Sequence, residues 1–449
     1  MSRSKRNKRN KRHPRFSSPF SLIVAAIVFV LVLGGVSFFI FNDSEKAKEK
    51  EEAPSSRTEA TVSDQKEERI VEETKPTVET KEESSITFYE ETDNTEEKVN
   101  RLVENMTLQE KIGQLLVVGF QSTEVDEHIR SMINDYHVGG VILFDRNMKT
   151  PEQVASLNNK LQDLAKQKDD QIPLWLSVDQ EGGQIMRMKD QVTAIPSQQS
   201  LGKQGNPEEV YKVAQRNGKE LATMGFNLNF APVLDLSATD SRSFGENPEQ
   251  AAQFGEKVVT GLNDAGIIST LKHFPGNGRS NIDPHIESSS VAVDKGDLKS
   301  SDIYPFKKIM DTVDHQRLFV MVTHIKYPAY DRENPASVSP IIIQDLLREE
   351  LGFTGLVVTD DLEMGAVNKY YSYGDLGYKA VNAGADILLV CHTLEHQKEV
   401  FNGILKAIET KKISEERIDE SVKRILTTKL ATIEETHVDP VKAKKFVGK

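Results

Sequence analysis

Residues 206–234, NPEEVYKVAQRNGKELATMGFNLNFAPVL, contain one complete unit of the pattern that decides the fold. Asn206 is a helix-capping residue type, Pro207 suits the first helical position and an acid follows at the third, so a helix is expected to begin here. Gly225 marks the end of that helix, because glycine readily adopts the left-handed conformation that closes helices. The apolar run 228–234 then predicts a strand.

The same alternation recurs over residues 97–435. The segments TPEQ at 150–153 and NPEQ at 247–250 repeat the helix start, and Gly266, Gly352 and Gly384 repeat the helix end. Eight short apolar runs alternate with helical segments, which predicts one α/β domain folded as a (β/α)8 TIM barrel. An open doubly wound sheet is the structural alternative. The expected strands are residues 115–120, 140–144, 174–178, 228–234, 267–271, 318–322, 356–358 and 387–390.

The N-terminal 41 residues carry a membrane signal. Eight Lys and Arg side chains and no acid occur in the first fifteen residues, and the next charged residue is Asp43. A helix over residues 20–41 would cover about 33 Å, enough for a hydrocarbon core of roughly 30 Å. Because positive residues stay on the cytoplasmic side, we expect a cytoplasmic basic tail (1–17), a single-pass signal-anchor helix (18–41) and an extracytoplasmic remainder. A cleaved signal peptide is the competing interpretation.

Composition sets further expectations. Residues 42–96 are rich in Glu, Lys, Ser and Thr, which predicts a disordered charged linker, and residues 436–449 are expected to form a C-terminal tail. The net charge of -12 argues against nucleic acid as a partner and requires any basic pocket to be local. The single cysteine, Cys391, is expected to be a buried thiol. The histidines lack metal-ligand spacing, so no metal or other cofactor is expected. The oligomeric state is not indicated.

Polar residues lie just past the C-terminal ends of several predicted strands. In a (β/α)8 barrel the C-terminal strand ends carry the active site, so these residues are expected to build it. They are Asp179, Asp235, Lys272 with His273, His324 and Asp360.

Asp360 is the candidate nucleophile. It ends the apolar run in VVTDDLEM (357–364), and a carboxylate held rigidly at a strand end is suited to attack an anomeric carbon. The alternative is that Asp360 or Asp361 caps the segment that follows. Two adjacent acids allow one to face the site while the other caps or orients.

Asp283 and His285 are the candidate general acid/base pair. They lie two positions apart in a Gly/Pro-rich loop that follows Lys272 and His273, so the carboxylate could orient the imidazole. An imidazole with a pKa near 6.5 suits a group that serves alternately as acid and base. The alternative is a surface loop with an Asx-turn.

Five ordered motifs together resemble the glycoside hydrolase family 3 β-N-acetylglucosaminidases of the NagZ type. The resemblance spans about residues 100–431. The motifs are VDQEGG (178–183), NFAPVLD (229–235), RSFG (242–245), KHFPG (272–276) and GFTG (352–355), which runs into TDDL (359–362).

The resemblance implies a function and a set of roles. It implies retaining hydrolysis of terminal β-linked N-acetylglucosamine (GlcNAc), with Asp360 as nucleophile and the Asp283/His285 pair in place of the usual carboxylic acid. Together with the outward-facing anchor, it suggests GlcNAc-containing muropeptides from peptidoglycan as the carbohydrate substrate, in cell-wall turnover or recycling. It also implies sugar-binding roles for a further set of residues. These are Asp179, Arg187, Arg242, Lys272 and His273.

Several alternatives remain open on the sequence. A β-glucosidase of the same broad family is the nearest rival, but such enzymes usually carry a second α/β domain, and about eighteen residues follow Ala431. An N-acetylglucosaminide phosphorylase and a non-catalytic wall-binding protein are the others. Glu181 is expected to hold a turn or a neighbouring arginine, and His324 either lines the site or is structural. Trp175 is expected in the core.

Overall fold

The computed structural model describes residues 86–280 and 288–449. The predicted basic tail, anchor helix and most of the linker lie outside the described residues, as does the Asp283/His285 pair. Among the helices that are described, none is both long and apolar enough to cross a bilayer.

Eight parallel strands form one sheet that nearly closes on itself. Their hydrogen-bonded order is β10-β1-β2-β3-β4-β5-β6-β9. Across the remaining seam, between β9 and β10, the N–H of Ile387 donates to the carbonyl of Val357 at 3.0 Å. The structure therefore confirms an α/β, TIM-like barrel rather than an open sheet. The strands are β1 Leu116–Val118, β2 Gly140–Leu143, β3 Trp175–Val178, β4 Leu228–Asn229, β5 Ile268–Phe274, β6 Leu318–Val322, β9 Leu356–Thr359 and β10 Leu388–Val390.

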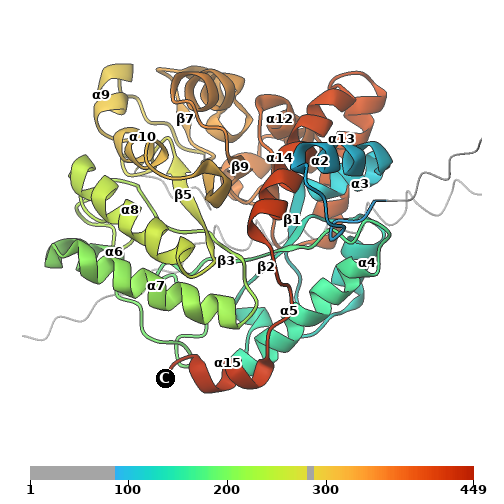
Figure 1. The fold of residues 1–449 in the computed structure, drawn as a ribbon. Coiled ribbons are helices and arrows are strands. Elements are labelled where there is room, and N and C mark those ends of the chain that lie inside the picture. The colour runs from blue at the N-terminus through green and yellow to red at the C-terminus, as the bar shows by residue number, and fades with distance from the viewer. Residues whose placement is uncertain (1–85, 281–287) are drawn as a thin grey trace, which may run out of the picture. The chain divides into compact units, whose positions relative to one another are not determined.

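Helices surround these strands (Figure 1). Thr150, Asn206 and Asn247 each accept a hydrogen bond from a backbone N–H of the first helical turn, as their sequence context predicts. The helices are α2 Thr95–Asn105, α3 Leu108–Gln114, α4 Glu127–Asn134, α5 Pro151–Lys166, α6 Gln198–Gln204, α7 Pro207–Thr223, α8 Pro248–Asn263, α9 Lys295–Ser300, α10 Tyr304–Met310, α11 Gly365–Asn368, α12 Tyr373–Ala383, α13 Leu394–Glu409, α14 Glu415–Thr432 and α15 Pro440–Phe446.

Shorter elements fill the connections. Residues Ile341–Glu350 wind as a π-helix before β9, and a hairpin of β7 (Lys326–Tyr327) and β8 (Asp331–Pro335) follows β6. The sequence pattern did not predict this hairpin. Single 3-10 turns occur at Asp145–Asn147, His315–Arg317 and Ala336–Val338.

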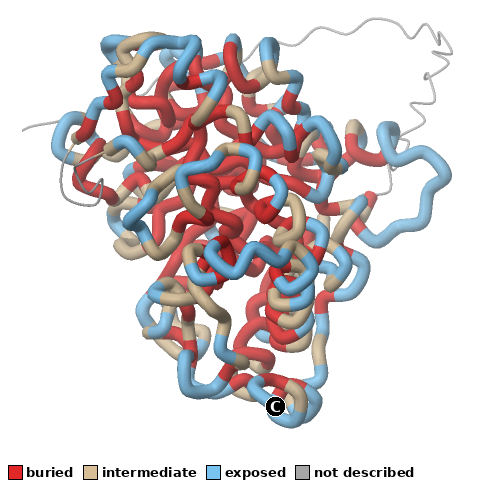
Figure 2. Tube along the Cα trace, turned by 90° about the vertical axis from the view of Figure 1, so that its left-hand side faces the viewer, coloured by how far each residue is buried: buried red, intermediate tan, exposed pale blue. Residues whose placement is uncertain are grey.

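The core occupies both the barrel interior and the space between strands and helices, and buried segments lie inside a more exposed outer surface (Figure 2). Trp175 on β3 and Phe319 on β6 meet edge to face with ring centroids 5.4 Å apart. Since β4 and β5 separate these strands in the sheet, the two rings contact each other across the barrel interior. Trp175 is fully buried, as predicted.

Two strands, β4 and β5, differ most from their predicted bounds at the rim. β4 ends at Asn229 instead of Leu234, because Pro232 has no N–H to continue the ladder. β5 continues to Phe274, and its register shifts between Leu271 and Phe274. Such a bulge re-aims side chains, and the two residues within it are Lys272 and His273.

The folded unit extends beyond residues 97–435 at both ends. Ile86 and Phe88, within the predicted linker, are buried, and the Phe88 N–H donates to the Asp170 carbonyl at 2.8 Å. Within the predicted tail, α15 packs against α5 and buries Ala443 (Figure 1). The few apolar residues of these polar segments cover the barrel surface, which composition averaged over a segment does not reveal.

Candidate active site

A cavity of about 170 Å³ opens at the C-terminal ends of the strands. Parallel pairing brings these ends to one rim, and the five predicted sugar-binding residues all reach this cavity together with Asp360. Its lining residues are Ile142, Phe144, Asp179, Glu181, Ile185, Arg187, Arg242, Lys272, His273, Met321, Asp360, Asp361, Met364, Leu389, Cys391 and His392.

A larger groove of about 690 Å³ is lined by Arg279, Lys326 and Tyr371, among others. Its described lining residues include no carboxylate and no histidine. The smaller cavity, which contains both kinds of group, is therefore the candidate for the chemistry.

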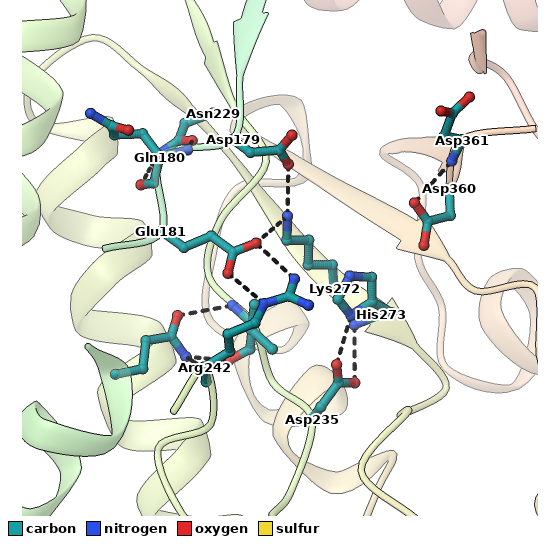
Figure 3. A network of polar contacts seen from close by, with 12 residues as sticks. Asp179, Gln180, Glu181, Asn229, Asp235, Arg242, Lys272, His273, Asp360 and Asp361 are labelled. Carbon is teal, nitrogen blue, oxygen red and sulfur yellow. Dashed lines mark hydrogen bonds and ion pairs between the residues drawn. The ribbon is translucent and has the colours of Figure 1, made fainter. Parts of the chain in front are cut away.

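Lys272 joins two carboxylates on one side of the cavity. Its Nζ lies 2.9 Å from Asp179 Oδ1 and 2.6 Å from Glu181 Oε1, and its side chain is only 3% exposed (Figure 3). Burial opposes ionisation of Glu181, but Lys272 and Arg242 outweigh it and lower the pKa of that carboxyl to about 2. The same two carboxylates overcome the effect of burial on Lys272 and raise its pKa. All three groups are therefore charged at neutral pH.

Two arginines complete this network. Arg242 donates from Nε and Nη2 to the two oxygens of Glu181, each at 2.8 Å. Arg187 Nη2 donates to Asp179 Oδ2 at 3.2 Å. Glu181 thus holds a neighbouring arginine, one of the two structural roles expected from the sequence.

His273 is oriented by Asp235. Its Nδ1 lies 2.6 Å from Asp235 Oδ2, and Asp235 Oδ1 accepts the backbone N–H groups of His273 and Asn277. Burial would raise the pKa of Asp235, but His273 and these hydrogen bonds outweigh it and lower that pKa. A carboxylate on Nδ1 fixes the proton there and leaves Nε2 for the cavity.

Asp360 follows β9 directly and lies on the other side of the cavity from the Asp179, Lys272 and Glu181 network (Figure 3). Its Oδ1 accepts the Asp361 N–H at 2.9 Å. Burial opposes its ionisation, but His273, His324 and that hydrogen bond prevail and lower the pKa of the carboxyl. Asp360 is therefore ionised, which is the form a nucleophile needs.

Of the two adjacent acids, Asp361 is the one whose carboxylate orients neighbouring groups. Its Oδ1 accepts the N–H of Glu363 at 3.1 Å, and its Oδ2 lies 3.2 Å from His392 Nε2. His324 is fully buried, with Nδ1 2.7 Å from Ser337 Oγ and Nε2 2.9 Å from the Asp361 carbonyl. It is thus held structurally while lying close enough to Asp360 to favour its ionised form.

His392 is an ionisable residue of the cavity that the sequence analysis did not single out. It follows Cys391, which is buried as predicted, directly after β10. The usable signal was its position after a predicted strand, the same signal that identified Asp179 and Asp360. Within residues 86–280 and 288–449, no group of three or more His, Cys, Asp or Glu side chains is placed to hold a metal ion.

The family described as "Glycosyl hydrolase family 3 N terminal domain" matches residues 107–428. The chain belongs to glycoside hydrolase family 3, a class of enzymes that cleave glycosidic bonds. Among its relatives, a β-hexosaminidase A from Pseudoalteromonas piscicida is 32% identical over 373 residues, which cover 72% of this chain and 62% of that protein. A β-hexosaminidase from Nitrosomonas eutropha is 32% identical over 321 residues, covering 68% of this chain and 90% of that protein.

Similarity to solved structures supports the same family assignment. A glycoside hydrolase family 3 β-N-acetylglucosaminidase from Paenibacillus sp. matches with a TM-score of 0.72 and 40% identity, covering 74% of this chain and 64% of that one. A β-N-acetylhexosaminidase from Beutenbergia cavernae matches with a TM-score of 0.66 and 28% identity, covering 72% and 98%. The chain spans less than two thirds of the Pseudoalteromonas and Paenibacillus proteins. Within family 3, these relatives are named as β-hexosaminidases, a β-N-acetylglucosaminidase and a β-N-acetylhexosaminidase.

Proposed function

We propose that this chain is a retaining exo-β-N-acetylhexosaminidase that removes terminal β-linked GlcNAc. The observation that carries the proposal is the ionised Asp360 at the end of β9, facing a compact charged network across a cavity of about 170 Å³. Pockets for drug-sized ligands usually measure about 300–1,000 Å³. A much smaller cavity suits a single sugar ring, and therefore removal of one unit from a chain end.

The proposed reaction has two steps. A carboxylate oxygen of Asp360 attacks the anomeric carbon, the glycosidic bond breaks, and the leaving oxygen takes a proton from the general acid. Water then attacks the resulting glycosyl ester, gives its proton to the same group acting as base, and releases the sugar with retained configuration. On the sequence, His285 oriented by Asp283 is the acid and base. Both residues lie outside the described residues, so their roles stay predictions.

The charged network is suited to neutral hydroxyl groups. Asp179, Glu181 and Lys272 are held rigid by their ion pairs, and hydrogen bonds to charged groups contribute about 1.5–3 kcal/mol each. Arg187, Arg242 and Lys272 each pair with a different carboxylate within 3.5 Å, those of Asp145, Glu181 and Asp179 respectively. Little positive charge is left to attract phosphate as an acceptor, which favours hydrolysis over phosphorolysis.

The substrate claim is tested by hydrolysis of a chromogenic β-N-acetylglucosaminide and the matching β-glucoside by the full-length chain. We expect clear preference for the N-acetylglucosaminide, free sugar as product with or without phosphate, and a loss of roughly a thousandfold or more in Asp360→Ala. Asp163→Ala, which removes an exposed surface carboxylate, is the control. Preference for the glucoside would overturn the substrate claim, and undiminished turnover by Asp360→Ala would overturn the nucleophile.

We further propose that residues 18–41 anchor the enzyme in the cell membrane with the barrel outside, where GlcNAc-containing muropeptides would be its substrates. The basic tail and the apolar run support this proposal. Deletion of residues 1–41 should move the protein from the carbonate-washed membrane fraction to the soluble fraction. Equal membrane retention after the deletion would refute the anchor.

A further inference from the structure

The walls of the cavity differ sharply in polarity. Residues of the loops after β3 and β4 and of β5 supply the ion-paired network around Lys272. The opposite wall, from β2, β6, β9 and β10, is mainly apolar. Its described apolar side chains are Ile142, Phe144, Met321, Met364, Leu389 and Cys391. On that wall the described polar side chains are those of Asp360, Asp361 and His392.

His392 is fixed in place from three directions. Its backbone N–H donates to Glu363 Oε2 at 2.5 Å, its ring Nε2 lies 3.2 Å from Asp361 Oδ2, and its ring packs against Phe144 at a centroid distance of 5.3 Å. Glu363 is in turn held by His396 Nδ1 at 2.6 Å. A side chain held this way loses little further conformational freedom when it binds a ligand.

The other ring nitrogen of His392 is available. Asp361 engages Nε2, and no atom of the described residues partners Nδ1. The side chain is 44% exposed although it lines the cavity. A prepositioned imidazole with one nitrogen directed by a carboxylate and the other unengaged by the described protein is suited to hydrogen-bond a ligand.

The geometry of a pyranose then limits which ligand group can reach His392. The reacting carbon C1 must lie at Asp360, so the substituent on the adjacent carbon C2 lies beside Asp360 as well. The far end of the ring, with its remaining hydroxyls, falls toward the charged network. Of the strands that flank β9, β6 contributes Met321 to the cavity, whereas β10 contributes His392 next to apolar side chains.

We propose that His392 is a specificity-determining residue that recognises the 2-acetamido group of the substrate. This inference rests on the proposed function. His392 accepts the acetamido N–H at Nδ1 while its Nε2 faces Asp361, and the acetamido methyl packs on the apolar wall that includes Phe144, Met364 and Cys391. A 2-hydroxyl is too short to contact that wall, so the same arrangement disfavours glucosides.

The proposal is tested by the ratio of kcat/KM for a chromogenic β-N-acetylglucosaminide to that for the matching β-glucoside, measured on the full-length chain. In His392→Ala we expect this ratio to fall roughly fivefold to tenfold, the size of one lost hydrogen bond. In His392→Asn, where the amide oxygen occupies about the place of Nδ1, the ratio should recover in part. His437→Ala is the matched control, because His437 also pairs with a carboxylate and is 43% exposed; its ratio should equal that of the wild type.

Each outcome bears on one claim. Equal losses on both substrates in His392→Ala would mean a purely structural role and would overturn the proposal, as would an unchanged ratio. A wild-type enzyme without preference for the N-acetylglucosaminide would instead overturn the proposed function, and with it this inference. The wild-type ratio thus separates failure of the function from failure of the role of His392.

Discussion

Lys272 and Glu181 illustrate what single residues add to the site. The sequence identifies Lys272 and its neighbour His273, because an apolar run that ends in charged residues is a local signal. It does not identify the partner of Arg242, which is Glu181, 61 positions away and on the loop after another strand. The barrel brings the loops after β3 and β4 together in space, and no local sequence pattern encodes that approach. The roles of Asp179 and Arg187 in sugar binding stay predictions, now supported by a shared cavity.

Lys429 on α14 gives a residue-scale prediction about stability. Its ammonium is completely buried, and Nζ donates to Gln114 Oε1 and the Gly139 carbonyl, both at 2.9 Å. Burial lowers its pKa to about 7, against an ordinary value of 10.5, although Asp170 opposes the shift. Between these two pKa values the unfolded chain holds a proton that the folded chain lacks. The free energy of unfolding contributed by this group therefore rises with pH from about 7 toward 10.5, and its penalty is greatest below pH 7.

Lys429→Met should remove this dependence. We expect the variant to be more stable than the wild type at pH 7, with the difference shrinking by at most about 1.4 kcal/mol per pH unit as the pH rises to 9. Urea unfolding at several pH values measures it. Lys423→Met, an exposed lysine on the same helix, is the control and should follow the wild type. Parallel stability curves for wild type and Lys429→Met would contradict the shifted pKa.

At the scale of elements, the residues that start and end helices are predicted more accurately than the lengths of the strands. All eight strands occur in the predicted order, and helix starts such as Asn206 and Asn247 cap as expected. The two largest errors have local causes: Pro232 interrupts the ladder of β4, and β5 continues through a bulge to Phe274. Local propensity shows that residues 228–234 and 267–271 are apolar and extended. It does not show where a tertiary ladder is broken.

Asp386, two residues before β10, gives a prediction at this scale. The fully buried carboxylate accepts hydrogen bonds from Arg424 Nε at 3.0 Å, Ser421 Oγ at 2.7 Å and the Val357 N–H at 3.0 Å, and pairs with Arg348. It thus ties α14, β9 and the π-helix to one point. Asp386→Ala leaves two partly buried arginines uncompensated, so the free energy of unfolding should fall by about 3–5 kcal/mol.

Urea denaturation of the Asp386→Ala chain checks this value. Asp163→Ala, at a surface pair, should change stability by no more than about 0.5 kcal/mol. A similarly small change in Asp386→Ala would show that the contacts of the Asp386 carboxylate do not stabilise the barrel.

At the scale of the whole molecule, charge is the feature that links sequence to function. A chain of net charge -12 was expected to confine positive charge to a local pocket, and Arg187, Arg242 and Lys272 do converge on one cavity. Membership in glycoside hydrolase family 3 agrees with the motif resemblance. The acid/base pair and the membrane anchor rest on the sequence, because their residues lie outside the described structure.

The central claim, that Asp360 attacks the sugar, is tested most directly by trapping the covalent intermediate. A 5-fluoro N-acetylglucosaminyl fluoride slows both steps by destabilising the oxocarbenium-like transition state, while its good leaving group lets the ester accumulate. After quenching and proteolysis, mass spectrometry should find one fluorinated sugar on the peptide that contains Asp360 and none in Asp360→Ala. An adduct on another residue, or steady turnover of the reagent with an unlabelled Asp360, would contradict the account.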